Sequence, residues 1–338
     1  ATGLYYYGYR YYAPWLQRWV SADPAGSVGG HNLFAMVGNN PVLFVDFEGL
    51  APSIFDGIRS MLSEGNKEAR GASEIHFSEY LRPQIMARKD HDKGKALSSV
   101  MQRLPKLDVK AADEFLTGAV SVLTNGIPTI NVSPDAMGAF SGSGMVNYWK
   151  GDKKDPVYGE RRAGVEEGMF QYKNSSNLLV KSHHSPSSRG FNSNLRPVYG
   201  ALQVLNDSVT VGGAPNYGAA AFYFSDASKS YMTMTGSDSL NMNASIDDLA
   251  LFENVYPLIS SMSRDTFEVV RAVVEGRVED VSVPSYANYI EVQAHSRSRW
   301  SDFNEVVFES EGAIRAHPKN KKISGFLNKN SLAVRYKG

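Results

Sequence analysis

Cysteine is absent from the 338-residue sequence. Its absence excludes disulfides, thiolate zinc sites and catalysis by a cysteine nucleophile. The sequence also lacks an apolar run of about 18 residues, the length that a membrane-spanning helix needs, and it lacks an N-terminal stretch of the signal-peptide type. We therefore expect a soluble chain with no membrane insertion that, if it is exported, uses another route.

No charge of one sign predominates, since 35 Lys and Arg residues face 35 Asp and Glu residues. A protein that binds nucleic acid electrostatically usually has a basic excess, over the whole domain or along one face. The few histidines show no spacing with carboxylates that is typical of a metal site. The sequence therefore argues against a nucleic-acid ligand and predicts no metal ion.

Aromatic residues are concentrated at the N-terminal end. The first 50 positions contain 11 of the 38 aromatic residues but five charged residues. The run from Leu4 to Tyr12 favours strands, and the Asn39-Asn40-Pro41 sequence predicts a turn. Fifty such residues could hardly form a sufficient core alone. We expect this segment to be the buried end of a larger structure.

Several motifs follow one another in this segment. They are Gly3-Leu4-Tyr5-Tyr6-Tyr7 with Arg10-Tyr11-Tyr12, Ser21-Ala22-Asp23-Pro24-Ala25-Gly26, Asn32-Leu33-Phe34, Asn39-Asn40-Pro41-Val42 and Asp46-Phe47-Glu48-Gly49-Leu50. In this order and spacing they resemble the end of the core of Rhs/YD-repeat proteins, and they are most similar to the C subunits of insecticidal Tc toxin complexes. The resemblance implies that residues 1–50 end a β-strand shell that encloses a C-terminal toxin.

The same resemblance implies an aspartyl-protease-like pair that releases the toxin after the final Gly-Leu. Carried over, the pair is Asp23 and Asp46, and the cut falls between Leu50 and Ala51. Two facing carboxylates that share a proton can activate water against a peptide carbonyl. Phe47 stands where the family usually has proline, and the alternative is that both aspartates cap turns. Because the rest of the shell is missing, we expect this fragment not to cleave itself efficiently.

Residues 51–180 predict a polar, helical lead-in. Apolar residues recur at helical spacing in two stretches, Ile54 to Leu62 and Val109 to Leu123. The glycine-rich segment 138–144 lacks the lysine and the strand-to-helix context of a phosphate loop, so we interpret it as a linker or turn.

Residues 181–338 have the pattern of an α+β domain. Short β-type runs are predicted at 198–205, 222–224, 231–235 and 289–294, with helices at 247–262 and 265–278. In the last strand, alternation places Glu291 and Gln293 on one face and Ile290 and Val292 on the other.

Four motifs in this part resemble bacterial toxin-associated ADP-ribosyltransferase domains. They are 195–202, 213–218, 235–239 and 289–295. The resemblance implies an ADP-ribosyltransferase-like mixed β domain that uses NAD as its substrate and needs no metal. It agrees with the first resemblance, because several Tc toxin C subunits release ADP-ribosyltransferases.

This second resemblance also implies roles for single residues. Arg196 holds the NAD phosphates or orients the ribose, and Tyr199 or Tyr217 stacks on the nicotinamide ring. Glu291 is the catalytic carboxylate, which stabilises the positive charge that develops on the ribose. Gln293 belongs to the same catalytic motif and flanks the acceptor side with His295.

The sequence departs from the family pattern at two places. The usual order of the acidic motif is reversed, and no Ser-Thr-Ser strand is evident, so Ser225, Ser237 or Ser239 is a candidate for that element. The alternatives are that Arg196 is a surface residue, that Ser239 belongs to a turn cap and that Glu291 is a solvated strand residue. Glu305, Glu309 and Glu311 are the other candidate acids.

Together these patterns predict a secreted toxin subunit with three parts. These are the end of an Rhs core (1–50), the lead-in (51–180) and the transferase domain (181–338). The resemblance implies a Tc toxin B subunit and an A-subunit translocation channel as partners. It also implies a target in the host-cell cytoplasm, such as actin or a Rho-type GTPase. The alternatives are an antibacterial effector that modifies a bacterial protein or RNA, and a non-enzymatic toxin that only binds its target.

Overall fold

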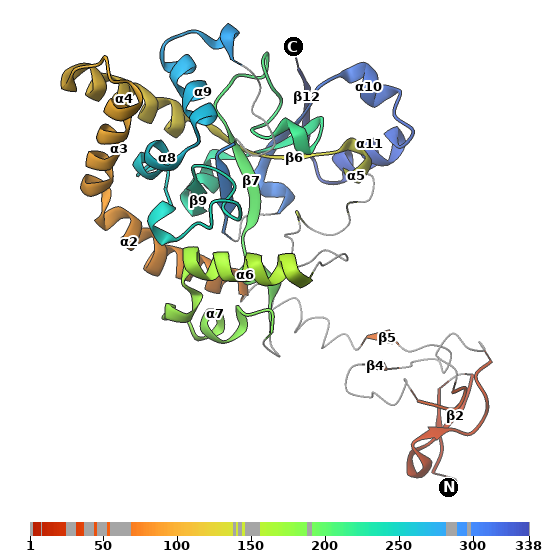
Figure 1. Ribbon diagram of the computed structural model, residues 1–338. Helices are drawn as coiled ribbons and strands as arrows, with labels where there is room; N and C mark the ends of the chain where they lie inside the picture. The colour runs from red at the N-terminus through yellow and green to blue at the C-terminus, as the bar shows by residue number, and fades with distance from the viewer. Residues whose placement is uncertain are drawn as a thin grey trace. The chain divides into compact units, whose positions relative to one another are not determined.

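The computed structural model divides the chain into two compact units, Ala1–Glu68 and Ala69–Gly338. The structure describes residues 3–7, 9–24, 32–36, 44–45, 53–54, 69–137, 140, 144–145, 156–187, 191–281, 289–295 and 299–337. Figure 1 shows the described residues of both units and labels many of their helices and strands.

The first unit contains short antiparallel strands beside a buried tryptophan. Strands β1 (Tyr5–Tyr6), β2 (Tyr11–Ala13) and β3 (Arg18–Trp19) form one sheet in this order, and β4 (Phe44–Val45) pairs with β5 (Ser53–Ile54). Trp19 is 1% exposed, and its ring packs edge-on against Tyr7 and Tyr12. Other aromatic side chains of this unit are more than half exposed: Tyr5, Tyr6, Tyr9, Tyr11 and Trp15. The aromatic run therefore forms strands, as expected, but several of its rings lie on the surface of the described part of this unit.

The second unit is α+β, as the sequence predicts for this part. Residues 69–76 are helical and lead through a π-helical turn (Phe77–Leu81) into α2. The helices are α2 (Arg82–Ala87), α3 (Lys89–Arg103), α4 (Val109–Asn125), α5 (Pro134–Met137), α6 (Pro156–Phe170), α7 (Leu178–His183), α8 (Tyr256–Ser261), α9 (Arg264–Val274), α10 (Glu311–Arg315) and α11 (Asn320–Lys329). The strands are β6 (Ile127–Val132), β7 (Val198–Gln203), β8 (Ala220–Phe224), β9 (Met232–Thr235), β10 (Glu291–Ala294), β11 (Phe303–Phe308) and β12 (Ala333–Tyr336).

The seven strands form one sheet in the order β12-β11-β8-β6-β7-β10-β9. Neighbouring strands are antiparallel except β11 and β12, which are parallel. Strand β6, from the predicted lead-in, lies at the centre between β7 and β8. The expected division at residue 180 is therefore not a division of the sheet, because residues on both sides of it pair with one another.

Helices cover the sheet through two apolar clusters. The larger cluster joins core-facing strand residues such as Phe222 and Val292 to Leu116 of α4, Leu258 of α8 and Val270 of α9. The smaller cluster joins the helical residues 69–87 to α6, α7 and the segment 240–251. Figure 1 shows α3, α4, α8 and α9 close together, with α6 and α7 side by side elsewhere on the unit. The amphipathic pattern of residues 109–123 is thus confirmed as α4, which buries Ala112, Phe115, Leu116, Ala119 and Leu123.

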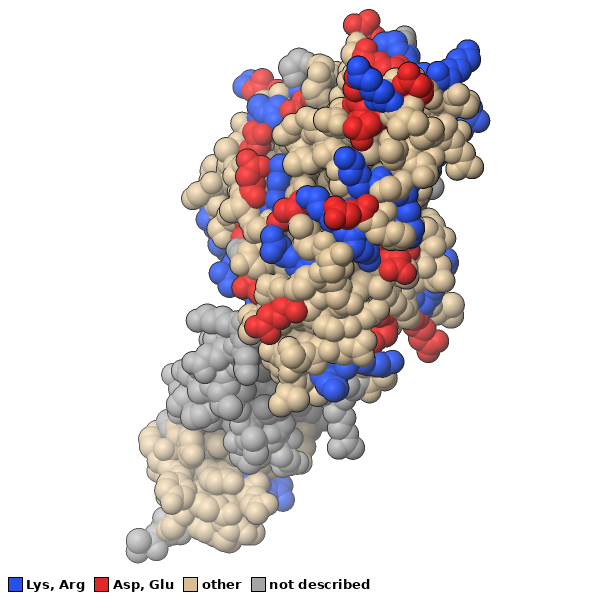
Figure 2. All heavy atoms as spheres, turned by 90° about the vertical axis from the view of Figure 1, so that its left-hand side faces the viewer, with Lys and Arg blue, Asp and Glu red and all other residues tan. Residues whose placement is uncertain are grey.

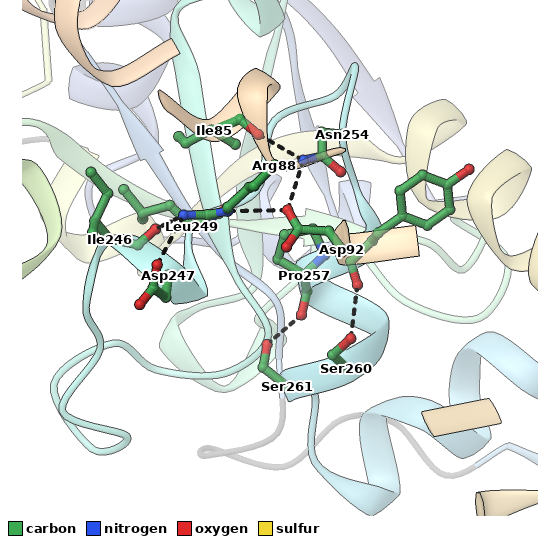
Figure 3. A network of polar contacts seen from close by, with 11 residues as sticks. Ile85, Arg88, Asp92, Ile246, Asp247, Leu249, Asn254, Pro257, Ser260 and Ser261 are labelled. Atoms are coloured by element: carbon green, nitrogen blue, oxygen red, sulfur yellow. Dashed lines mark hydrogen bonds and ion pairs between the residues drawn. The ribbon is translucent and has the colours of Figure 1, made fainter. Parts of the chain in front are cut away.

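A polar network fixes α2 and α3 to the segment 246–254. The guanidinium of Arg88 donates to Asp92 Oδ2 (3.1 Å) and to the carbonyl oxygens of Ile246 (2.7 Å) and Leu249. The Asn254 side chain donates to the same Asp92 oxygen and to the carbonyl of Ile85, at 3.0 Å each. Figure 3 shows Arg88 and Asn254 converging on the carboxylate of Asp92. The buried charge of Asp92 is therefore compensated from two sides.

The surface of the second unit carries both signs of charge. Figure 2 views the face beside α3 and α4, where blue and red side chains intermingle. This distribution agrees with the zero net charge of the sequence. None of the helices in the described part of the chain has the length and apolar character that a membrane crossing needs.

Candidate active site

Three neighbouring strands bring a row of polar side chains to one face of the sheet. On β10, Val292 and Ala294 belong to the large apolar cluster, so alternation turns Glu291 and Gln293 to the opposite face. Glu291 is paired with Ala201 of β7 and Thr235 of β9, and Gln293 is paired with Tyr199 and Thr233. The alternation expected from the sequence is confirmed.

Glu291 lies in a pocket of about 280 Å³. The pocket is lined by Ile130, Asn131, Met145, Tyr158, Arg162, Val198, Tyr199, Gly200, Ala201, Ala214, Tyr217, Asp238, Tyr289 and Glu291. Four of these residues are tyrosines, and Tyr217 and Tyr289 contact edge to face with their ring centroids 5.9 Å apart. A concave site with aromatic walls and a few charged groups is typical of a small-molecule site.

Arg162 of α6 supplies a buried cation to the same pocket. It is 5% exposed, and its guanidinium donates to Ser239 Oγ (3.0 Å) and Tyr158 Oη (3.1 Å). The guanidinium also lies over the ring of Tyr199, 4.5 Å from its centroid. A guanidinium has five N–H donors, and the remaining N–H groups of Arg162 form no hydrogen bond within the described part of the chain. Arg162 can therefore bind an anionic group of a ligand in the pocket.

The environment of Glu291 holds its carboxyl group near the midpoint of titration at neutral pH. Burial raises the pKa of Glu291 to about 7, although Arg162 and the hydrogen bond from Ser239 act in the opposite direction. Asp238 also faces the pocket and raises the pKa further. A carboxyl group with such a pKa in a cleft is a candidate catalytic group.

Gln293 lies behind Glu291, outside the lining of the pocket. It is fully buried, and its amide nitrogen donates to Glu291 Oε1 (2.9 Å) and Thr235 Oγ1 (3.2 Å). Its amide oxygen accepts from Thr233 Oγ1 (2.9 Å), which also contacts His295 Nε2 (3.0 Å). Gln293 and His295 therefore contact other protein groups at the back of the site, whereas the resemblance implies that they flank the acceptor side.

Arg196 also lies outside the lining of the pocket. It is 3% exposed, forms an ion pair with Glu166 of α6, and donates to the carbonyl oxygen of His184 at 2.7 and 3.1 Å. Glu166 in turn accepts a hydrogen bond of 2.7 Å from Tyr199 Oη. Arg196 is thus neither a surface residue nor in position to contact a ligand in the pocket, since its guanidinium is committed to buried protein acceptors.

The structure also places the remaining expected residues. Tyr199 and Tyr217 line the pocket, whereas Ser239 is fully buried at its edge, and its backbone N–H points at Glu291 Oε1 (3.4 Å). In the first unit, Asp23 forms an ion pair of 2.9 Å with Arg10, and both side chains are buried. Asp46, Leu50 and Ala51 lie outside the described residues, so the proposed protease pair and cleavage point stay predictions.

Arg162 and Glu166, both on α6, were not identified from the sequence. They lie one helical turn apart, so both point to the same side of α6. The sequence signal for this pair was a basic and an acidic residue four positions apart, in a segment that also contains the apolar residues Val165 and Met169. Within the described residues, no group of three or more His, Asp and Glu side chains is arranged to hold a metal ion.

Comparisons with known proteins concern a short part of the chain. Toxin subunit YenC1 of Yersinia entomophaga is 63% identical over 60 residues, which is 18% of this chain and 6% of that protein. Toxin subunit YenC2 of the same organism is 65% identical over 52 residues, 15% of this chain and 5% of that protein. The protein YibJ of Escherichia coli K12 is 49% identical over 49 residues, 14% of this chain and 21% of that protein.

These comparisons support the first resemblance in part. The chain contains a segment related to Tc toxin C subunits. The matched segment of the chain spans about one-twentieth of the length of each of these toxin subunits. No family model matches the chain.

Proposed function

We propose that Ala69–Gly338 is a mono-ADP-ribosyltransferase that uses NAD as its substrate. The observation that carries this proposal is the position of Glu291, a buried carboxyl group that faces a pocket with tyrosine walls and a guanidinium. The aromatic faces suit a nicotinamide ring, and the guanidinium suits a phosphate. A pocket of this size accommodates the nicotinamide riboside part of NAD rather than the whole molecule.

The ionised carboxylate of Glu291 acts on the ribose in this proposal. It accepts a hydrogen bond from a ribose hydroxyl and stabilises the positive charge that develops on the sugar as the bond to nicotinamide breaks. A nucleophilic side chain of the target forms the new bond to the anomeric carbon and loses its proton, and nicotinamide leaves. Because the pKa of Glu291 is about 7, the ionised fraction increases through neutral pH, and activity is expected to increase with it.

Arg162 replaces Arg196 as the phosphate-binding residue in this proposal. Arg196 is held by Glu166 and His184, whereas Arg162 lines the pocket and has N–H groups to donate. Tyr199 or Tyr217 remains the residue that stacks on the nicotinamide, as the resemblance implies, since both line the pocket.

The related segment supports a toxin context for this activity. We propose that the chain is part of a secreted toxin that associates with Tc toxin B and A subunits. Asp23 and Asp46 release the transferase by cleavage after Leu50, and the target is a host protein such as actin or a Rho-type GTPase. An antibacterial effector with the same chemistry, or a toxin that only binds its target, is the alternative.

A labelling experiment tests the transferase. The chain and its Glu291→Gln variant are incubated with biotinylated NAD and with eukaryotic or bacterial lysate. We expect a labelled protein band that is absent with Glu291→Gln, and the lysate that supplies it distinguishes a host target from a bacterial one. Equal labelling by the variant would move the catalytic role to another acid. A toxic chain that labels nothing in either lysate would favour the binding alternative.

A further inference from the structure

A continuous row of buried hydrogen bonds leads from Glu291 to His295. Its members are Glu291, Gln293, Thr233 and His295, each at most 2% exposed. The contacts are Gln293 Nε2 to Glu291 Oε1 (2.9 Å), Thr233 Oγ1 to Gln293 Oε1 (2.9 Å) and Thr233 Oγ1 to His295 Nε2 (3.0 Å). The row runs along the face of the sheet opposite the large core, and each of its buried polar groups has a hydrogen-bond partner within the row.

The hydrogen atoms available to these groups allow one directed arrangement. The hydroxyl of Thr233 has a single hydrogen, which it donates either to Gln293 or to His295. If it donates to Gln293 Oε1, His295 must donate through Nε2–H, and the amide nitrogen of Gln293 then faces Glu291. Every contact in the row then pairs one donor with one acceptor.

The reversed arrangement fails at Glu291. It would turn the amide oxygen of Gln293 towards the carboxylate oxygen of Glu291, which accepts hydrogen bonds when it is ionised. The same oxygen would face the hydroxyl of Thr235, whose hydrogen is already donated to the carbonyl of Ser237 at 2.8 Å. The directed arrangement is therefore the one compatible with an ionised Glu291.

We propose that Thr233 and His295 are positioning residues, which orient the amide of Gln293 so that it holds one oxygen of Glu291 and leaves the other oxygen to face the ligand. Ser239 N–H points at the same Oε1 atom, which strengthens this division of roles. The inference rests on the proposed catalytic role of Glu291 for its consequence in the reaction, but the hydrogen-bond direction itself does not depend on that role.

The surroundings of both ends are consistent with this direction. Phe77 and Phe170 surround His295, whose pKa is lowered to about 3 by burial and by His76, so the ring is neutral. The charged and titratable groups that interact electrostatically with Glu291 are Arg162 from α6, Tyr199 from β7, Asp238 after β9 and Tyr289 before β10, and two further tyrosines, Tyr158 of α6 and Tyr217 before β8, line the same pocket. These groups influence the charge of Glu291 directly, whereas Thr233 influences it through Gln293 alone.

The tautomer of His295 tests the direction without any substitution. Nitrogen NMR of the unsubstituted chain, with the signal assigned by its loss in His295→Gln, distinguishes the two ring nitrogens. Above about pH 8, where Glu291 is mostly ionised, we expect the neutral ring with its hydrogen on Nε2. A neutral ring with its hydrogen on Nδ1, or a charged ring at pH 7, overturns the proposal.

Thr233→Val tests the positioning role, because valine has the same shape but no hydroxyl. Carbon NMR of the Glu carboxyl groups, with Glu291 assigned by its loss in Glu291→Gln, reports the titration of Glu291. Without the orienting hydroxyl, Gln293 no longer donates firmly to the carboxylate, so the pKa of Glu291 is expected to rise. Thr233→Ser retains the hydroxyl and should restore the original titration. Thr266→Val, the same change at a buried position on α9, is the matched control.

These measurements separate this inference from the proposed function. If Glu291 becomes about tenfold weaker as an acid in Thr233→Val, labelling from NAD at pH 7 falls about fivefold and recovers at higher pH. A raised pKa with no labelling by any variant supports the positioning role and refutes the transferase. A titration of Glu291 that is the same in folded Thr233→Val as in Thr266→Val overturns the positioning role, whatever the labelling.

Discussion

Replacing Glu291 with glutamine should stabilise the fold at alkaline pH and leave its stability unchanged at acidic pH. The pKa of the buried carboxyl group rises from 4.5 to about 7 on folding. Between these pH values the folded state holds a proton that the unfolded state has released, so stability falls as pH rises through this window. A difference of about 2.5 pH units corresponds to about 3 kcal/mol, which Glu291 costs the fold above pH 7.

Thermal unfolding at pH 4.5 and pH 8.5 measures this effect. Glutamine is always neutral, so we expect Glu291→Gln to melt with the original chain at pH 4.5 and roughly 6 °C above it at pH 8.5. Glu160→Gln, an exposed position of the same helix as Arg162, is the matched control and should change neither value by much. Equal melting of Glu291→Gln and the original chain at pH 8.5 would refute the reasoning, since burial would then cost the carboxylate nothing.

Three further substitutions test other contacts. Glu166→Gln removes the carboxylate that pairs with the buried guanidinium of Arg196. The free energy of unfolding, measured in urea, should fall by about 3–5 kcal/mol, and a loss below about 1 kcal/mol would contradict a desolvated ion pair. Arg88→Ala removes the hydrogen bonds of Arg88 to Asp92, Ile246 and Leu249 (Figure 3) and should cost about 2–4 kcal/mol, whereas Arg264→Ala, an exposed position on α9, should cost little. Arg162→Lys keeps the charge but loses the fork of donors, so calorimetry should show NAD binding at least about tenfold weaker; unchanged affinity would exclude Arg162 as the phosphate-binding residue.

In the second unit, the sequence predicts those strands whose own side chains favour β structure. Residues 198–205, 222–224 and 231–235 contain β-favouring side chains and form β7, β8 and β9. Side chains alternate between the two faces of any strand, so the sequence alone predicts that Glu291 and Gln293 lie on the same face of the sheet. The pocket tyrosines Tyr199 and Tyr217 were found through the family resemblance.

Strand β6 and helix α6 could not be predicted in the same way. Proline has no N–H group to donate and is therefore unfavourable in a central strand. Pro128 pairs with β7 but not with β8, so its missing N–H leaves no carbonyl group of β8 without a donor. Helix α6 contains three glycines in 15 residues, which weakens any helical prediction. Both elements are fixed by tertiary contacts with segments far along the chain.

The role of Arg196 illustrates the same limit. An arginine before a strand is compatible with a ligand contact or with exposure, and the sequence offered both readings. Its actual partner, Glu166, is 30 residues away on α6. No local pattern connects two residues at this separation, so their pairing is known from the structure alone.

Release of nicotinamide from NAD tests the central proposal most directly, because it detects the reaction whether the acceptor is a protein or an RNA. The purified chain is incubated with NAD and with eukaryotic or bacterial lysate, and nicotinamide is quantified by chromatography beside Glu291→Gln. We expect release that depends on the lysate, increases from pH 6 to pH 8 and is lost in the variant. Equal release by Glu291→Gln, or none by the folded chain with either lysate, would contradict the assignment of this pocket to ADP-ribosyl transfer.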